Sequence, residues 1–508
     1  MNVHLPFCRY VGELRSRGLL RGESATHGAQ NTQIGYITYD SRRVRPGTLF
    51  ICKGAGFKET YLADAKNSGA VAYVSETKYE NVDLPALTVS DVREATVVLG
   101  QMFYGHVTDR LTTVGITGTK GKSTTAYYLR AILDAQFAAE GRRPAAIMSS
   151  IHTFDGVSET ESDLTTPEPL ELYAHFQNAF DSGLTHMIME VSSQALKYGR
   201  VQGMSFDVAC FLNIGEDHIS PVEHPDFADY FASKLKIFSL AKIACINADS
   251  DRFAQIVQAA EKAGADVVTF GKNGADVRIS NIRVLSGEIV FRVDSRSFRG
   301  DFSITMPGVF NVENAAAAIA VAQCLNVPEQ YVREGLRKAR AEGRMQIYKS
   351  ADGLVTGVVD FAHNKMSFRA VFDTMKQMNP QAQIVAVFGS AGGKAISRRK
   401  DLGQTAGEYA DFVILTEDDP GSEPVADICA DIARYVSCPY MTVPARDEAI
   451  GKAILGEYPH SGNALPRVVL CLGKGHESTM KYARGPEVFP SDSVLVQRFL
   501  AQYNALHA

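Results

Sequence analysis

The pattern of apolar and polar positions along the chain predicts strands and helices in alternation. Short apolar runs at 48–51 and 70–74 indicate strands among helical and turn-rich stretches in the first hundred residues. From Leu111 the order becomes an apolar strand, a glycine turn and a helix, and apolar residues recur at helical spacing over 124–137. This order is typical of the opening of a parallel-sheet domain.

Later apolar runs extend this pattern and divide the chain. Buried strands are expected at 185–190, 208–213 and 243–247, followed by an alanine-rich helix at 314–324. Strands at 357–360, 384–388, 412–415 and 467–471 then alternate with helical stretches, which predicts a third, doubly wound domain. The fold class is therefore α/β, with expected domains at residues 1–110, 111–342 and 343–508.

Composition and charge narrow the classes of function. A chain of 508 residues is too long for one core, which fits several domains. Its 52 basic and 57 acidic residues are interspersed, which argues against a nucleic-acid partner. No run approaches the roughly 18 apolar residues of a membrane span, and the N-terminus turns polar too early for a signal sequence. Eight scattered cysteines without zinc-ligand spacing fit a reducing interior, so we expect a cytoplasmic protein without membrane insertion.

The segment 117–124, with the sequence TGTKGKST, is the strongest chemical signal. Its backbone N–H groups and the following helix N-terminus can face phosphate oxygens, while Lys122 can neutralise phosphate charge and Ser123 can ligate Mg²⁺. The general phosphate-loop pattern places glycine at position 116, but Ile116 stands there and Gly115 lies one residue earlier. A turn rich in Gly, Lys and Ser is the alternative, and the flanking strand and helix favour phosphate binding over it.

Two further residues have side chains that could ligate a metal. Glu190 closes one predicted strand, and His218 follows the next one, so both are expected near the phosphate loop. Lys234 lies on a predicted helix. Taken alone, Glu190 is more typical of a solvated or capping residue, His218 of a structural one and Lys234 of a surface lysine.

Several motifs in order carry a family resemblance. TGTKGKST, EVSS from Glu190, the Asp217–His218 pair with Lys234 behind it, and GVFNVENAAAA at 308–318 resemble the Mur ligase family. The segments 40–42 with 46–50, 165–167 and 473–477 are similar to its MurE type, the UDP-N-acetylmuramoyl-tripeptide synthetase. The resemblance spans essentially the whole chain. It implies a three-domain architecture with a central phosphate-loop parallel-sheet domain and a C-terminal Rossmann-like domain.

The resemblance assigns roles to individual residues. It implies two Mg²⁺ ions, one held by Ser123 and Glu190 and the other by His218 and a carbamylated Lys234. The catalytic residues that it implies are Lys122, Glu190, His218 and Lys234. For ATP it implies Gly118, Thr119, Lys120, Gly121, Lys122, Ser123 and Thr124 at the phosphates, Asn311 at the adenine, and Arg344 and Asp360 near the triphosphate and ribose. For the UDP-muramoyl-dipeptide it implies Ser41 and Arg42 at the uridine nucleotide, and Thr165, Thr166, Ser192 and Arg200 at the phosphate, sugar and peptide parts.

The implied reaction activates the D-glutamate carboxylate of the dipeptide as an acyl phosphate, which an amino acid then displaces. MurE-type enzymes that add meso-diaminopimelate carry Asp-Asn-Pro-Arg, whose arginine pairs with the distal carboxylate. This chain has Asp-Asp-Pro-Gly at 418–421, which favours a distal ammonium and therefore L-lysine, or else L-ornithine. We expect Asp418, Asp419 and Glu477 near that side chain and Arg399 near the α-carboxylate. The alternative is a turn before a helix, which is compatible with substrate contact.

Two segments differ from the family's motifs, and two alternative functions have to be considered. The segment 361–366 differs from the family's Tyr-Ala-His-Thr-Pro-Asp, and 392–400 differs from its Gly-Asp-Arg-Asp run, so Arg398 and Arg399 both stay open as the contact with the amino acid. A folylpolyglutamate-type ligase is one rival, and the segment at 40–42 favours the MurE type. A non-catalytic relative is the other, but the four metal-ligand positions are all present. We expect a monomer.

Overall fold

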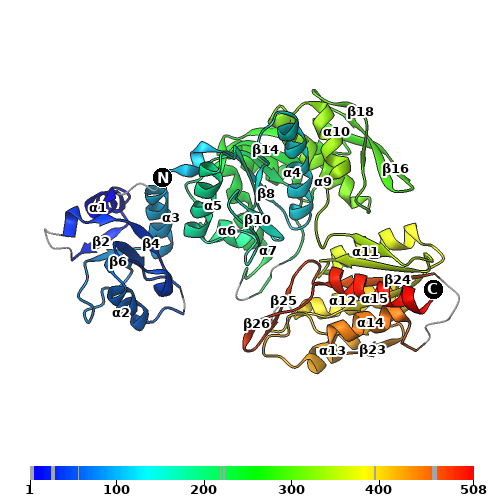
Figure 1. The fold of residues 1–508 in the computed structure, drawn as a ribbon. Coiled ribbons are helices and arrows are strands. Elements are labelled where there is room, and N and C mark those ends of the chain that lie inside the picture. Colours follow the sequence, from blue (N-terminus) through cyan, green and yellow to red (C-terminus); the bar gives the residue numbers. More distant parts are fainter. Residues whose placement is uncertain are drawn as a thin grey trace.

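Three bodies, each built on its own sheet, form the computed structural model of the chain (Figure 1). The structure describes residues 5–24, 29–54, 56–217, 219–220, 223–393, 396–459 and 466–507. The α/β class is confirmed, because helices cover sheets of mainly parallel strands in all three bodies. The domain boundaries after residues 110 and 342 stay predictions.

The N-terminal body, blue in Figure 1, has a five-stranded sheet in which β4 to β7 are parallel and β2 is antiparallel at one edge. The predicted runs at 48–51 and 70–74 are its strands β5 and β6. Its helices are α1 (Phe7–Ser16), α2 (Glu59–Asn67) and α3 (Val92–Phe103), with short turns η1 (Ala29–Asn31), η2 (Ser41–Arg43) and η3 (Val107–Arg110). Its strands are β1 (Leu5–Pro6), β2 (Leu20–Glu23), β3 (Gln33–Ile34), β4 (Tyr36–Thr38), β5 (Thr48–Ile51), β6 (Ala70–Ser75) and β7 (Ala86–Val89).

The central body is an eleven-stranded mixed sheet with buried apolar clusters on both faces. Its strands are β8 (Thr112–Thr117), β9 (Ala146–Met148), β10 (His152–Phe154), β11 (Glu159–Glu161), β12 (His186–Glu190), β13 (Phe206–Phe211), β14 (Ala241–Asn247), β15 (Asp266–Gly271), β16 (Val277–Leu285), β17 (Glu288–Asp294) and β18 (Arg299–Ile304). Its helices are α4 (Lys122–Ala139), α5 (Pro169–Asp181), α6 (Ser193–Lys197), α7 (Phe227–Leu235), η4 (Lys236–Leu240), α8 (Phe253–Ala263), α9 (Phe310–Cys324) and α10 (Glu329–Lys338). All the strands and helices predicted between 111 and 324 are confirmed within a few residues.

The expectation of a parallel central sheet needs a correction. Strands β9, β12, β8, β13, β14 and β15 are parallel, but β10 and β11 at one end and β17 and β18 at the other run antiparallel to their neighbours. The segment 277–304 was not predicted as strands. In β17 buried residues alternate with partly exposed ones, so a period of two was the available signal.

The C-terminal body, yellow to red in Figure 1, is a doubly wound six-stranded sheet, as predicted. Helices α11, α12 and α13 pack on one face, and α14 and α15 pack on the other. Its helices are α11 (Lys365–Met378), α12 (Ser397–Tyr409), α13 (Val425–Ala433), α14 (Arg446–Leu455) and α15 (Asp492–Leu506). Its strands are β19 (Gln346–Lys349), β20 (Val355–Asp360), β21 (Gln383–Phe388), β22 (Phe412–Leu415), β23 (Tyr440–Thr442), β24 (Arg467–Leu472), β25 (Thr479–Tyr482) and β26 (Gly485–Val488).

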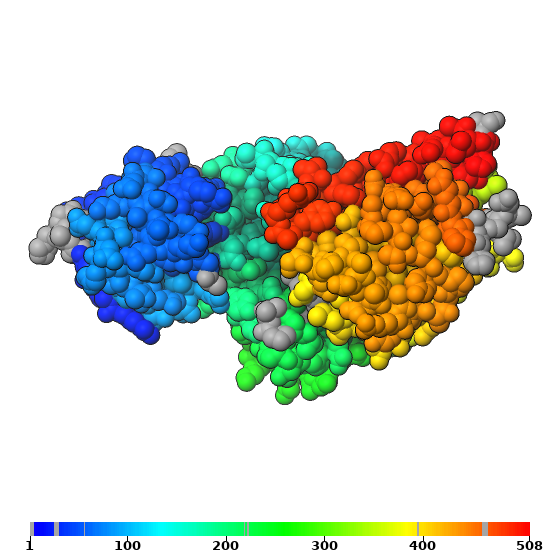
Figure 2. Space-filling view, turned by 90° about the horizontal axis from the view of Figure 1, so that it is seen from below, coloured from blue at the N-terminus to red at the C-terminus, as the bar shows by residue number. Residues whose placement is uncertain are grey.

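The N-terminal body lies beside the central one, and the C-terminal body packs against the central one on its lower side in Figure 1, the side that faces the viewer in Figure 2. Side chains join them directly: Asn364 Nδ2 donates to Asp217 Oδ2 at 2.9 Å, and Arg344 Nη2 donates to Ser123 Oγ at 3.1 Å. The carboxyl ends of β8 and β12 therefore face the C-terminal body. Within the described ranges, no helix has the length and apolarity to cross a membrane.

Candidate active site

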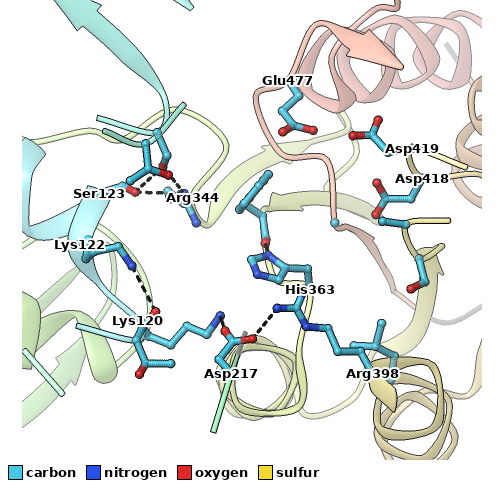
Figure 3. Close-up of a pocket in the computed structure, with 18 of the residues that line it drawn as sticks. Lys120, Lys122, Ser123, Asp217, Arg344, His363, Arg398, Asp418, Asp419 and Glu477 are labelled. Atoms are coloured by element: carbon cyan, nitrogen blue, oxygen red, sulfur yellow. Dashed lines mark hydrogen bonds and ion pairs between the residues drawn. The ribbon is translucent and has the colours of Figure 1, made fainter. Parts of the chain in front are cut away.

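A cavity of about 350 Å³ lies between the central and C-terminal bodies (Figure 3). Its central wall is the phosphate loop with Glu190, and its C-terminal wall includes Asp418, Asp419 and Glu477. Eleven residues predicted for the site line it: Thr119, Lys120, Gly121, Lys122, Ser123, Thr165, Glu190, Arg344, Asp418, Asp419 and Glu477. Segments that are far apart in the sequence thus supply two chemically different walls of one space.

The phosphate loop turns tightly between β8 and α4 because glycines occupy its strained positions. Gly118 and Gly121 both have positive φ, and a Cβ on Gly121 would lie 2.2 Å from Asn314 Oδ1. Gly115, the residue out of place in the general pattern, has a packing role instead, because a Cβ there would lie 2.9 Å from the ring of Phe206. The loop is fixed from outside by Asn213, whose Oδ1 accepts from Lys120 N at 2.9 Å.

Two lysines converge on one carbonyl at the base of this loop. Lys122 Nζ and Lys234 Nζ each donate to Gly118 O at 2.9 Å. Burial lowers the pKa of Lys122 and lowers that of Lys234 well below its ordinary value. Burial also lowers the pKa of Lys120 to about 8. The loop therefore concentrates cationic groups where an anion would relieve the cost of burying their charge.

Ser123 and Glu190, the residues predicted to hold one Mg²⁺, are joined through Ser150. Glu190 is buried at the end of β12, and its Oε1 accepts from Ser150 N at 2.8 Å. Ser150 Oγ lies 3.0 Å from Ser123 Oγ. Hydroxyl and carboxylate oxygens suit Mg²⁺, which commonly takes one or two protein ligands and completes its shell with phosphate and water oxygens. The donor set fits that ion.

The second predicted metal site is described only in part. His218 lies outside the described residues, and Lys234 is buried beneath the phosphate loop. Among the residues that the structure describes, no group of three or more His, Cys, Asp or Glu side chains has a metal-binding arrangement. Among the described residues, Ser123 and Glu190 are thus the pair predicted to hold Mg²⁺ whose positions the structure gives.

A second cavity of about 210 Å³ adjoins the first through Lys120, Gly121 and Arg344, which line both. It also contains the predicted nucleotide residues Thr124, Asn311 and Asp360, together with apolar atoms of Phe310, Met366 and Val371. Asn311 Nδ2 donates to Pro307 O at 2.6 Å, and its Oδ1 accepts from Asn314 Nδ2 at 2.9 Å. This lining combines apolar and polar groups beside the phosphate loop, and it suits the flat, polar-edged base of a nucleotide.

The acidic wall contains a cation of its own. Lys474 Nζ donates to Glu477 Oε2 at 2.6 Å and to Asp419 Oδ1 at 2.8 Å. Burial raises the pKa of Asp418 to about 6. Burial alone would also raise the pKa of Asp419, but Lys474 holds it below its ordinary value. The turn at 418–424 does precede helix α13, so the turn and the cavity wall coexist.

The expected place of Arg399 beside the α-carboxylate of the amino acid is not supported by its geometry. Arg399 is buried, and its guanidinium donates to Glu423 Oε1 at 2.7 Å and to Asp431 Oδ2 at 3.0 Å. The Arg399 guanidinium is therefore already paired with two carboxylates, and Arg399 does not line the cavity. Arg398 does line the cavity and forms an ion pair with Asp217. Of the two, only Arg398 lines the cavity, and its contact with the amino acid stays a prediction.

Of the residues predicted for the UDP-linked substrate, Thr165 lines the cavity, and Arg200 pairs with Glu168, which also pairs with Lys53 of the N-terminal body. Thr166 Oγ1 donates to Glu190 O at 2.9 Å, and Ser192 caps α6 beside it. Arg200 Nη1 donates to Thr166 O at 3.2 Å, and its Nε pairs with Glu168 Oε1 at 2.7 Å.

Ser41 and Arg42 form the turn η2 in the N-terminal body, away from the lining of the cavity. Arg42 is exposed and pairs with Asp40. The structure thus brings Thr166, Ser192 and Arg200 together and leaves Ser41 and Arg42 apart from them.

Sequence reasoning gave no role to Asp217 and Asn364, which join the central and C-terminal bodies. Asp217 accepts Lys120 at 3.2 Å, Asn364 at 2.9 Å and also Arg398, so it joins both bodies. Asn364 caps α11 and stands where the family pattern was altered. Both residues lie next to motifs that were recognised, and this was the signal in the sequence. Their residue types did not indicate which side chains of the other body they contact.

Together the fold and the cavity define a three-domain α/β protein with a phosphate-loop site between two domains. The family described as Mur ligase middle domain matches residues 116–322, and Mur ligase, glutamate ligase domain matches residues 343–475. The UDP-N-acetylmuramoyl-L-alanyl-D-glutamate L-lysine ligase of Enterococcus faecalis is 36% identical over 479 residues, covering 93% of this chain and 92% of its own. The chain belongs to the Mur ligase family.

Solved structures show the same fold at lower identity. The structure of UDP-N-acetylmuramoyl-L-alanyl-D-glutamate 2,6-diaminopimelate ligase has 24% identity and a TM-score of 0.66, with 100% of both chains covered. MurF ligase from Thermotoga maritima, solved in complex with ADP, has 18% identity and a TM-score of 0.62 over 94% of this chain and 99% of its own. The three-domain layout is therefore shared across the whole chain.

Proposed function

We propose that this protein is an ATP-dependent ligase of peptidoglycan precursor synthesis. It joins L-lysine to the D-glutamate carboxylate of UDP-N-acetylmuramoyl-L-alanyl-D-glutamate. The observation that carries the proposal is one cavity with a phosphate loop on one wall and Asp418, Asp419 and Glu477 on the other. The name of the Enterococcus faecalis relative, which specifies the L-lysine reaction, supports it. The cytoplasm and a monomeric state belong to the same proposal.

In the proposed reaction the D-glutamate carboxylate attacks the γ-phosphate of ATP, and ADP leaves. The lysine amino group then displaces phosphate from the acyl phosphate and forms the amide bond. Two anions approach each other in the first step, so fixed positive charge at the point of attack lowers the barrier. Lys122 lies on the loop side and Arg344 on the C-terminal side of the cavity, where each can donate to phosphate oxygens. The packed walls limit hydrolysis of the acyl phosphate.

Ser123 and Glu190 are the residues that would hold a Mg²⁺ ion at the phosphates. When bound, the ion would neutralise phosphate charge during the transfer. A second Mg²⁺ at His218 and a carbamylated Lys234 rests on the family resemblance. The buried position of Lys234 beneath the loop is compatible with it, because a carbamate forms from the neutral amine and is itself an anion that can ligate Mg²⁺.

The acidic wall supports L-lysine as the added amino acid. Three carboxylates face two ammoniums, those of Lys474 and Lys481, so the wall keeps an excess of one negative charge when all are ionised. A distal ammonium of the substrate would reduce that excess, whereas a distal carboxylate would increase it. Gly421 provides no cation, and no atom lies within 4 Å of the position that a Cβ would take there. Gly421 therefore supplies no cation for a second carboxylate, and the ammoniums of Lys474 and Lys481 are already paired with carboxylates of the wall.

A substrate panel tests this proposal. Phosphate release from ATP should require UDP-muramoyl-dipeptide and should be fastest with L-lysine, slower with L-ornithine and slowest with meso-diaminopimelate. Asp419→Asn should raise the KM for lysine about tenfold, because a carboxylate partner of the ammonium becomes a neutral amide, and should leave the KM for ATP nearly unchanged. Asp427→Asn, on the exposed side of α13, is the matched control.

Two outcomes would refute parts of the proposal separately. Preference for diaminopimelate would make the L-lysine assignment wrong and leave the ligase reaction standing. Phosphate release with folate and glutamate, but not with the UDP-linked substrate, would instead identify a folylpolyglutamate-type ligase.

A further inference from the structure

Ser150 of the central body contacts Ser123 and Glu190, the two residues suited to Mg²⁺, and it also contacts the C-terminal body. Its backbone N–H donates to Glu190 Oε1 at 2.8 Å, and its hydroxyl lies 3.0 Å from Ser123 Oγ. Its carbonyl oxygen is 3.1 Å from His476 Nε2, and its hydroxyl accepts from Arg344 Nη2 at 3.3 Å. Ser150 thus contacts both Ser123 and Glu190 on one side and two C-terminal residues on the other.

The turn that carries Ser150 has little freedom to absorb a displacement. Ser149 Oγ donates to His152 O at 2.9 Å and accepts from the backbone N–H groups of Ile151 and His152, each at 3.1 Å. The turn follows directly from β9, an inner strand of the sheet. A pull on the Ser150 carbonyl therefore moves its N–H and hydroxyl together with it.

His476 is held in place on the C-terminal side. It is buried, and its ring lies 5.8 Å from the ring of Phe361, over which Arg344 also packs. A Cβ on Gly343 would lie 2.3 Å from His476 N, so the backbone at the start of the C-terminal body touches the 473–477 segment. The position of the imidazole consequently follows that of the whole body.

We propose that Ser150 and His476 are positioning residues that couple the docking of the C-terminal body to the geometry of the Ser123–Glu190 metal-binding pair. The inference rests on the proposed function, because it assigns that pair to Mg²⁺. With the body docked, His476 fixes the Ser150 carbonyl, and Ser150 in turn orients the Glu190 carboxylate and the Ser123 hydroxyl. With the body displaced, both metal-suited groups lose that support at the same time.

Metal binding without turnover tests the coupling. Mn²⁺ is titrated into the full-length protein with bound ADP, and the signal of free Mn²⁺ is followed by electron paramagnetic resonance. His476→Leu removes the donor to Ser150 and should weaken Mn²⁺ binding about fivefold, as loss of one hydrogen bond in the chain allows. His476→Gln keeps an N–H donor and should stay within about twofold of the unchanged protein. Ser150→Ala removes the hydroxyl contacts from the central side and should also weaken binding.

The control is a second contact across the same interface. Ser478 Oγ donates to Glu161 of β11 without contacting Ser123, Glu190 or Ser150, so Ser478→Ala should leave Mn²⁺ affinity unchanged. Unchanged affinity in both His476→Leu and Ser150→Ala would overturn the proposal, and so would equal losses in His476→Leu and Ser478→Ala. If His476→Leu does not fold, His476→Phe takes its place, because it keeps a ring against Phe361 and also lacks the donor to Ser150. Because the titration uses only ADP and Mn²⁺, it stays valid if the substrate assignment fails.

Discussion

Asp418 lines the cavity, where it can contact a bound ligand, but its buried environment disfavours its own negative charge. Burial raises its pKa to about 6, and Asp419 and Glu477 act in the same direction against Arg446 and Lys474. The unfolded chain ionises this carboxyl near its ordinary pKa of 3.8, so it releases its proton first as the pH rises. Stability of the folded state is therefore lost between about pH 4 and pH 6, and the loss is complete at neutral pH.

Asp418→Asn should consequently stabilise the unliganded protein at pH 7, by about 1–2 kcal/mol. The gain should shrink at pH 5, where the native carboxyl is largely protonated. Urea unfolding at the two pH values measures both effects. The same variant should bind lysine more weakly in the substrate panel, because the ammonium loses a carboxylate partner. A lower stability at pH 7 than that of the unchanged protein would contradict this account.

Sequence reasoning reached residues in strong local motifs and missed those defined by distant partners. The phosphate loop and Glu190 were predicted because strand ends in a parallel sheet share one edge. Ser150 carries no such signal, since its role depends on Glu190 and on His476, more than 300 positions away. Arg398 and Arg399 could not be separated, because neighbours on a helix point about 100° apart and the helix phase comes from packing.

At the scale of elements, the longer buried strands were predictable, whereas the short strand β9 and the edge strands were not. The runs that became β8, β12, β13 and β14 are continuous and apolar because helices cover both faces of the sheet. The hairpins β16–β18 have one exposed face, so their apolar residues are diluted by Arg, Asp and Ser. Their signal was alternation, which is weaker than a continuous apolar run.

The contact between α4 and α10 gives a prediction about this scaffold. Helix α4 begins at the phosphate loop, and Gly335 of α10 lies directly against its backbone. A Cβ on Gly335 would be 2.4 Å from Ile132 Cα, and backbone cannot move aside as a side chain can. Gly335→Ala should therefore push the helices apart and lower the free energy of unfolding by about 2 kcal/mol, measured by urea denaturation.

Gly12→Ala is the matched control for that measurement. Gly12 lies inside α1, is exposed, and has no atom within 4 Å of the position of an added Cβ. Without a clash, alanine should stabilise the protein slightly, by up to about 1 kcal/mol, because glycine is the poorer helix former. Equal effects of the two substitutions would show that helix propensity, and not the contact with α4, governs position 335.

At the scale of the whole molecule, the docked arrangement gathers positive charge. Lys120 and Lys122 from the central body meet Arg344 and Arg398 from the C-terminal body around one cavity. Asp217 pairs with two of these cations and thereby offsets part of their repulsion. Several hydrogen bonds between side chains or to the backbone join the two bodies, and polar interdomain contacts commonly permit relative motion. Anionic ligands in the cavity would therefore favour the docked state.

We accordingly expect the C-terminal body to move away from the central one in solution without ligands and to return when nucleotide and UDP-muramoyl-dipeptide bind. Small-angle X-ray scattering should show a decrease in the radius of gyration on addition of both ligands. Asp217→Asn removes the carboxylate that holds Lys120 and Arg398, so the unliganded variant should be more extended than the unchanged protein. Ligand phosphates still supply negative charge to the cavity, so the variant should nonetheless contract when they bind. Identical scattering curves with and without ligands would contradict the motion, and the cavity would then have to admit its substrates with both walls in place.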